Sequence, residues 1–272
     1  MNAQPNPLKE KINELWAQED KSNLDLSPVH EVIEKLDRGE LRSAYRVTDF
    51  GKSTWFVNEY VKKAILLWLR FSKSRVFQSD LGNCYDKIPL KTENWTDKDF
   101  TNAGFRVVPG GMIRYGSFIS KSVVVMPAFI NVGVFIGEGT MIDSNSLVGS
   151  CAQIGMNCHI SDGVTIGGVL EPLQSTPVII EDNCFIGVRS SVTEGVIVEE
   201  GSVIGAGTIL TASTRIIDRR TGDVSYGKIP AYSVVVPGAY AKDGFSLYAA
   251  IIVKQVDQKT REKTAINELL RY

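Results

Sequence analysis

The sequence predicts a mainly β fold in which residues 106–240 form a parallel β-helix of six-residue repeats. Three observations support this: an aliphatic column with a period of six, a column of small residues two positions earlier, and glycines just after the aliphatic. Such a run of branched aliphatics does not arise by chance, and a fixed period indicates a repeat architecture. The aliphatic column contains Ile130, Ile136, Ile142, Val148, Ile154, Ile160 and Ile166, then Ile180, Ile186, Val192, Val198, Ile204, Leu210 and Ile216.

Both columns are predicted to point into a triangular tube. The aliphatic fills the tube, and the smaller residue fits near a corner, where space is limited. Three hexads then make one coil, and stacked coils bury a continuous core. We expect the glycines to supply the backbone freedom that a corner needs; they are Gly137, Gly149, Gly155, Gly167, Gly187 and Gly205.

The repeat is interrupted twice and is flanked by different patterns. Residues 169–177 and 217–230 break the period, so we expect loops there that leave the coil. Residues 1–105 carry helical apolar stripes and are predicted to form an N-terminal α+β domain. Residues 241–272 are predicted to form a C-terminal segment with one strand (246–256) and a closing helix.

Composition excludes several classes of function. The chain has 272 residues and a net charge of -1, with no basic stripe that would favour nucleic acid. The polar start of the chain predicts neither a signal peptide nor a membrane span. The cysteines match no zinc motif, so we expect free thiols and a cytoplasmic protein. With only two histidines, His30 and His159, the chain lacks the three zinc ligands of a γ-type carbonic anhydrase.

Several segments resemble the tetrahydrodipicolinate N-succinyltransferase family, within the hexapeptide-repeat acyltransferases. The segment IGGVLEPLQ is the most specific of them, because it belongs to the loop that breaks the repeat and not to the repeat itself. A structural subunit or a lipid A sugar-nucleotide acyltransferase would share only the repeat. The matching segments are GFRVVPGG (104–111), EGTMID (138–143), VGSCAQIG (148–155), IGGVLEPLQ (166–174), IIEDNCFIG (179–187), EGVIVEEGSVI (194–204) and INELLR (266–271).

The resemblance implies a left-handed β-helix and a homotrimer with active sites between subunits. It implies transfer of succinyl from succinyl-CoA, a co-substrate, to the amine of L-2-amino-6-oxopimelate, the open form of tetrahydrodipicolinate. This reaction belongs to diaminopimelate and lysine biosynthesis. No permanently bound cofactor, metal, nucleic acid or membrane is implied. The alternative is a sister enzyme that uses acetyl-CoA on the same acceptor.

The resemblance also assigns site residues. Asp143 ends EGTMID and is expected to bind the substrate ammonium and accept its proton; the competing interpretation is a solvated turn aspartate. Arg106 is expected to grip a substrate carboxylate, unless it forms a structural ion pair at the domain boundary. Apart from the resemblance, geometry makes Gly168 a candidate to donate its backbone N–H to the thioester oxygen, because glycine lets a ligand approach closely.

Two positions depart from the family pattern. Ser191 stands where the family has an acid offered by the adjacent subunit, so the acid role is relaxed or a neighbour such as Glu194 covers it. Asn145 replaces an aromatic residue. Many hexapeptide acyltransferases use a histidine base, yet we expect His159 to be an exposed or interface histidine. The candidates for CoA phosphates, which also suit a solvated face, are Lys254, Lys259, Arg261 and Lys263.

Overall fold

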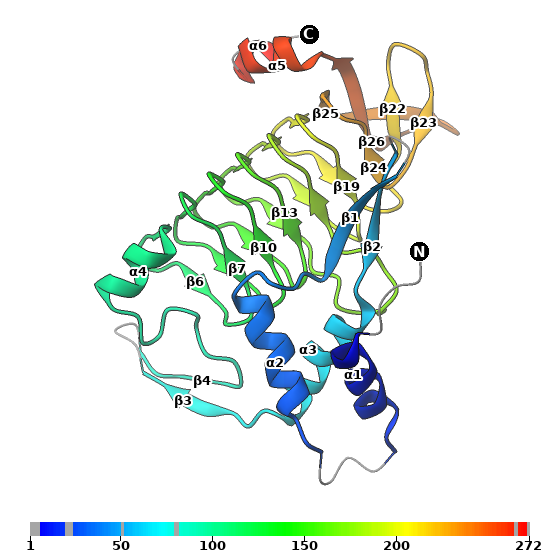
Figure 1. Cartoon of the computed structure of the whole chain (residues 1–272). Coiled ribbons are helices and arrows are strands. Elements are labelled where there is room, and N and C mark those ends of the chain that lie inside the picture. Colours follow the sequence, from blue (N-terminus) through cyan, green and yellow to red (C-terminus); the bar gives the residue numbers. More distant parts are fainter. Residues whose placement is uncertain (1–5, 20–23, 50–51, 79–81, 264–265, 271–272) are drawn as a thin grey trace.

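A computed structural model describes residues 6–19, 24–49, 52–78, 82–263 and 266–270. Its body is a triangular parallel β-helix, shown in green and yellow in Figure 1. The N-terminal helices pack beside the first coils, and the C-terminal strands and helices lie at the opposite end. The predicted fold class is therefore confirmed. None of the helices in the described ranges is long and apolar enough to cross a membrane.

Three faces of short parallel strands make up the coil, and the chain passes from face 1 to face 2 to face 3 in each turn. Face 1 contains β6 (Met112–Ile113), β9 (Phe129–Ile130), β12 (Leu147–Val148), β15 (Thr165–Ile166), β18 (Ser191–Val192) and β21 (Ile209–Leu210). Face 2 contains β7 (Phe118–Ile119), β10 (Phe135–Ile136), β13 (Gln153–Ile154), β16 (Ile179–Ile180), β19 (Ile197–Val198) and β24 (Lys228–Ile229). Face 3 contains β5 (Arg106–Val107), β8 (Val124–Val125), β11 (Met141–Ile142), β14 (His159–Ile160), β17 (Phe185–Ile186) and β20 (Val203–Ile204).

The two predicted inward columns form the core of the coil. Each aliphatic from Ile130 to Leu210 is the second residue of its strand and stacks on its counterpart one coil away, as Ile136 does on Ile154, whereas Ile216 begins the strand Ile216–Asp218. Every member of the aliphatic column is at most 1% exposed, and the small column is buried as well. Cys158 and Cys184 belong to the small column and are packing residues. Burial raises the pKa of the Cys184 thiol well above its ordinary value.

The corner glycines have a different purpose from the one predicted. Gly137, Gly149, Gly155, Gly167, Gly187 and Gly205 do not have positive φ angles. A Cβ atom on Gly137 would instead lie 2.5 Å from the carbonyl carbon of Gly155, one coil away. In most corners a positive φ angle falls two residues later, for example at Gly139, Asn145 and Cys151. The prediction of backbone freedom was therefore wrong: these glycines allow close contact between successive coils.

A helical layer covers the corner between faces 1 and 2. It consists of α1 (Pro7–Ala17), α2 (Ser27–Asp37) and α3 (Glu59–Phe71), whose apolar sides share a core with Val132 and Cys151 of the coil. Asp37 joins α2 to the coil, since it accepts a hydrogen bond from Gly116 N and pairs with Lys91 at 2.7 Å. The layer and the coil therefore pack as one continuous body.

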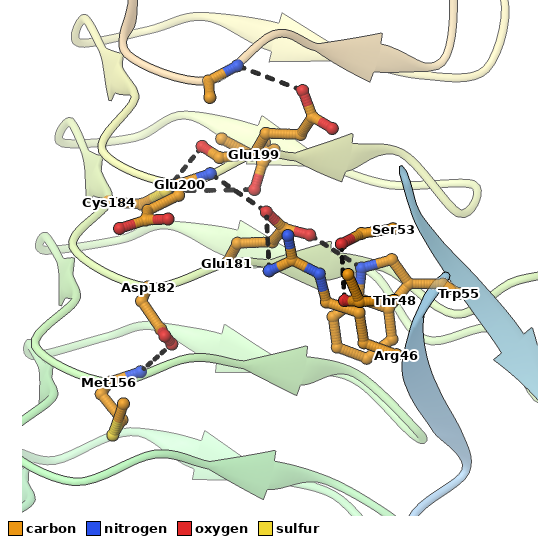
Figure 2. A network of polar contacts seen from close by, with 12 residues as sticks. Arg46, Thr48, Ser53, Trp55, Met156, Glu181, Asp182, Cys184, Glu199 and Glu200 are labelled. Atoms are coloured by element: carbon orange, nitrogen blue, oxygen red, sulfur yellow. Dashed lines mark hydrogen bonds and ion pairs between the residues drawn. The ribbon is translucent and has the colours of Figure 1, made fainter. Parts of the chain in front are cut away.

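The hairpin of β1 (Ala44–Asp49) and β2 (Lys52–Val57) lies along face 2. Figure 2 shows the contact: Glu181, buried at 7% exposure, accepts a hydrogen bond from Trp55 Nε1 at 2.8 Å and lies 3.6 Å from Arg46 Nη1. The Arg42 guanidinium lies 3.7 Å from the centroid of the Phe135 ring. The hairpin thus covers the outward side chains of face 2.

The start of the coil is closed by aromatic residues. The helix α4 (Asp97–Ala103) begins with a capping box between Thr96 and Asp99 and ends at Gly104. Around it, Trp95, Phe100 and Phe105 pack on the first coil. A small hairpin of β3 (Arg75–Phe77) and β4 (Cys84–Asp86) lies beside them.

The two interruptions of the repeat differ in structure. The first, between β15 and β16, packs on the helical layer, where the buried Lys62 amine donates to Ser175 O at 2.5 Å. Burial lowers the pKa of that amine. The second contains β22 (Ile216–Asp218) and β23 (Val224–Ser225), which pair as an antiparallel hairpin before β24 rejoins face 2.

The C-terminal segment extends face 3. The long strands β25 (Ser233–Lys242) and β26 (Phe245–Gln255) pair antiparallel, and β25 continues the face next to β20. The helices α5 (Gln258–Lys263) and α6 (Ile266–Leu269) follow, and Leu269 is buried against the β20–β25 region. Arg271, the last residue of the INELLR segment, lies outside the described residues.

Candidate active site

Asp143 lies at the corner between faces 3 and 1, directly after β11. Its backbone N–H donates to Ile160 O of the next coil at 2.8 Å, so the register of β11 and β14 holds its position. Its side chain points away from the tube and is 34% exposed. The carboxylate is therefore accessible while its backbone is held by the coil.

His159 contacts this carboxylate. In the stack of face 3, His159 lies directly opposite Met141, and Asp143 is two residues further along the same strand direction, so both side chains point outward on neighbouring strands. The distance from His159 Nε2 to Asp143 Oδ2 is 3.0 Å. From the sequence, we expected His159 to be an exposed or interface histidine and not a functional one. In the sequence, His159 follows Asp143 by two residues fewer than the length of one coil. This spacing is the sequence signal that could have suggested the contact.

The two departures from the family pattern have local partners. The Asn145 amide donates to Asp162 Oδ1 of the next coil at 3.1 Å, so this corner carries two carboxylates on successive coils, Asp143 and Asp162. Glu194 lies after face 1, where its Oε2 accepts from Ala212 N at 3.1 Å. Ser191 is the outward residue of β18 on face 1. Within one chain, Glu194 therefore caps a turn, and this turn lies away from the corner that holds Asp143.

Arg106 is on the same face as His159. It is the outward residue of β5, which is separated from β11 by one strand, β8. The backbones of β5 and β11 are therefore about 10 Å apart, or two strand spacings. The long side chain of Arg106 can extend over part of this distance. Within the described part of the chain, the exposed Arg106 guanidinium has no carboxylate partner. The structural ion pair considered as the alternative is thus not found among these residues.

Gly168 lies at a different corner, between faces 1 and 2, and is exposed. A Cβ atom there would be 2.7 Å from Ser150 N, so packing against the preceding coil already requires glycine. Its backbone N–H has no acceptor among the described residues. The full width of face 1 separates it from Asp143, so a single chain does not bring these two predicted site residues together.

Face 1 presents apolar side chains to solvent along its length. Met112 is 47% exposed, Leu147 38% and Ile209 47%, and all three are outward residues of their strands. The exposure of these three side chains shows that neither the helical layer nor the hairpin covers them. The polar outward residues Thr165 and Ser191 lie between Leu147 and Ile209, so the exposed apolar side chains of this face do not form one continuous patch.

Of the hollows among the described residues, two are lined in part by residues of the coil, and both lie away from Asp143. One, of about 350 Å³, lies between the hairpin and face 2 and is lined by Arg42, Trp55 and Phe135 among others. The other, of about 250 Å³, lies under α5 beside Tyr232 and Arg261. Arg261 donates to Gly201 O at 3.1 Å and to Asn183 O at 3.2 Å, so it attaches α5 to the coil. Neither hollow is lined by Asp143, Arg106 or Gly168.

Three family models match separate parts of the chain, one in the N-terminal region and two in the coil. The N-terminal domain of tetrahydrodipicolinate N-succinyltransferase matches residues 7–71. The bacterial transferase hexapeptide model matches residues 133–168, and the hexapeptide repeat of succinyl-transferase matches residues 177–212. These matches agree with the left-handed β-helix expected from the resemblance.

Curated relatives match over the whole chain. A 2,3,4,5-tetrahydropyridine-2,6-dicarboxylate N-succinyltransferase from Dechloromonas aromatica is 50% identical, covering 97% of this chain and 98% of the relative. An enzyme of the same name from Paramagnetospirillum magneticum is also 50% identical, with 97% and 98% coverage. A solved N-succinyltransferase structure from Campylobacter jejuni is 14% identical over 86% of this chain and 64% of that one, with a TM-score of 0.46. On the evidence of the relatives and the N-terminal model, the chain belongs to the tetrahydrodipicolinate N-succinyltransferase family.

Proposed function

We propose that Asp143 binds and deprotonates the acceptor amine when this enzyme transfers succinyl from succinyl-CoA to L-2-amino-6-oxopimelate, the open form of tetrahydrodipicolinate. The transferase activity follows from membership of the family. The observation that carries the role of Asp143 is its placement: an outward carboxylate held at a corner of the coil, with one oxygen bound by His159. Its Oδ1 has no hydrogen-bond partner among the described residues.

The chemistry requires a proton acceptor at this point. An alkyl amine is protonated at neutral pH and must lose its extra proton before its nitrogen can attack the thioester carbon. The ionised Asp143 carboxylate attracts the ammonium and accepts that proton at Oδ1. The nitrogen forms its bond to the thioester carbon and the C–S bond breaks. As the nitrogen becomes an amide it gives up a second proton, which goes to the sulfur, so that CoA leaves as its thiol, and the proton on Asp143 is released to solvent.

The carboxylates of the acceptor need a cation, and the developing negative charge on the thioester oxygen needs a hydrogen-bond donor. Arg106 lies on face 3, which leads into the corner that holds Asp143, and it has no carboxylate partner among the described residues, so its guanidinium suits a carboxylate of the acceptor. The N–H of Gly168 suits the thioester oxygen. Because Gly168 and Asp143 are at different corners of one chain, they share a site only if two subunits contribute to it.

We propose a homotrimer in the cytoplasm, with each active site between two subunits. The apolar side chains on face 1 support the assembly, and the separation of Asp143 from Gly168 supports a shared site. Free cysteines support a reducing compartment.

The activity is tested by a thiol-release assay with succinyl-CoA and tetrahydrodipicolinate. We expect turnover with succinyl-CoA and much slower turnover with acetyl-CoA. Equal or faster turnover with acetyl-CoA would instead favour an N-acetyltransferase. If no amino-dicarboxylate acceptor releases thiol with either donor, the proposed function is wrong.

Leu147→Arg is expected to dissociate the trimer. An arginine at the centre of face 1 would bring like charges together around a threefold axis and bury them without partners. Light scattering after size-exclusion chromatography should give a particle close to the 29.9 kDa subunit mass. Val224→Arg, at a residue that is 43% exposed on β23, is the matched control and should remain trimeric. An unchanged mass for Leu147→Arg would exclude face 1 as the interface.

Arg106→Lys is expected to raise the KM for the acceptor about 10- to 100-fold, with a smaller effect on the KM for succinyl-CoA. Lysine keeps the charge but loses the bidentate geometry, and a hydrogen bond to a charged group contributes about 1.5–3 kcal/mol. Steady-state kinetics with each substrate varied in turn measures the effect. Arg75→Lys, on the β3–β4 hairpin, serves as the control. An unchanged acceptor KM in Arg106→Lys would remove Arg106 from the acceptor site.

A further inference from the structure

We propose that His159 is a positioning residue for Asp143: its Nε2–H holds Oδ2 of the carboxylate, so that Oδ1 remains directed at the acceptor amine. This inference rests on the role proposed for Asp143 above. It is carried by the geometry of the two side chains and by what surrounds them.

The direction of the hydrogen bond follows from the chemistry of the two groups. An ionised carboxylate has no proton and only accepts hydrogen bonds. At 3.0 Å between Nε2 and Oδ2, the histidine must therefore be the donor, and its proton is on Nε2. A carboxylate held at one oxygen keeps its other oxygen in a defined direction, whereas a free aspartate on a surface rotates about its side-chain bonds.

The ring of His159 is itself held in place. It lies 5.4 Å from the ring centroid of Phe185 on the next strand of face 3, with Met141 on the strand before it. Both neighbours are apolar. Asp143 is the one ionisable side chain recorded in contact with the imidazole within the described ranges. The histidine thus packs against an aromatic ring on one side and is bound to a single carboxylate on the other.

Stability does not explain the pair. His159 is 46% exposed and Asp143 34% exposed. Exposed ion pairs contribute only about 0–1 kcal/mol, and the coil is already held by its buried columns. A contact of little value to folding, made to the carboxylate at the reaction centre, is better explained by orientation of that carboxylate.

The test compares two replacements of His159. His159→Gln keeps a side-chain N–H donor able to reach Oδ2, whereas His159→Phe keeps a ring to pack on Phe185 but has no donor. We expect kcat to fall about 10- to 100-fold in His159→Phe, the size of effect that a misplaced catalytic group produces. The KM for succinyl-CoA should change little, and His159→Gln should recover most of the loss. His159→Leu replaces the phenylalanine variant if that variant does not fold.

A double-mutant cycle distinguishes positioning from an independent role. If His159 acts through Asp143, adding His159→Phe to Asp143→Asn should cause little further loss. A full additional loss in that background, equal losses in His159→Gln and His159→Phe, or a normal kcat in His159→Phe would each overturn the proposal. If Asp143→Asn alone is fully active, the role of Asp143 fails as well. An inactive Asp143→Asn together with a normal His159→Phe would overturn only the positioning role.

Discussion

Asp143→Asn is expected to lower kcat by about 10²- to 10⁴-fold, the range that a positioned general base contributes. The amide is close in shape to the carboxylate but cannot attract the ammonium or accept its proton. It can still accept the hydrogen bond from His159 through its oxygen, so the corner should keep its structure. The thiol-release assay measures the loss, and thermal denaturation should show a Tm near that of the parent.

A matched control separates this effect from a general loss of one negative charge. Asp97→Asn makes the same chemical change at an exposed position in the first turn of α4, away from the corner. It should keep full activity. Binding of CoA by Asp143→Asn, measured by calorimetry, should also remain. Wild-type turnover in Asp143→Asn would remove this residue from the mechanism, whatever the behaviour of the other variants.

Gly187→Ala is expected to cause a large loss of stability for the addition of a single methyl group to the coil. A Cβ atom on Gly187 would lie 2.6 Å from Ala206 N and 2.7 Å from Ile204 O, both backbone atoms of the next coil. Neither can move without separating two stacked coils. We expect a loss of about 3 kcal/mol or more, at the upper end of overpacking effects. Urea denaturation measures it.

Gly207 provides the control, since it lies at the same corner one coil later but faces open space. Its φ is +70°, and a Cβ there meets nothing within 4 Å. Gly207→Asn should therefore cost little, because asparagine tolerates the left-handed region. If Gly187→Ala proves as mild as Gly207→Asn, close contact between coils is not the reason for the glycine at position 187.

The sequence by itself determined the fold of the middle of this chain. A coil that repeats every three hexads places equivalent residues on top of one another, so the stacking of Ile142 on Ile160, or of Ile186 on Ile204, follows directly from their spacing. The same periodicity located Asp143 at a corner with its side chain outward. The family motifs predicted Arg106, and the structure puts it on the same face as His159.

Only the tertiary structure decided the contacts that depend on side-chain direction and on distance between coils. The hydrogen bond between His159 and Asp143 requires two outward side chains on neighbouring strands to turn toward each other. A sequence repeat does not determine side-chain rotamers, so the repeat by itself could not establish this contact. Position 187 requires glycine because the backbone of the next coil lies too close to leave room for a Cβ atom, and only the stacking of the coils brings that backbone close. The separation of Gly168 from Asp143 likewise becomes visible only in the closed tube. There, Asp143 lies at one edge of face 1 and Gly168 at the other.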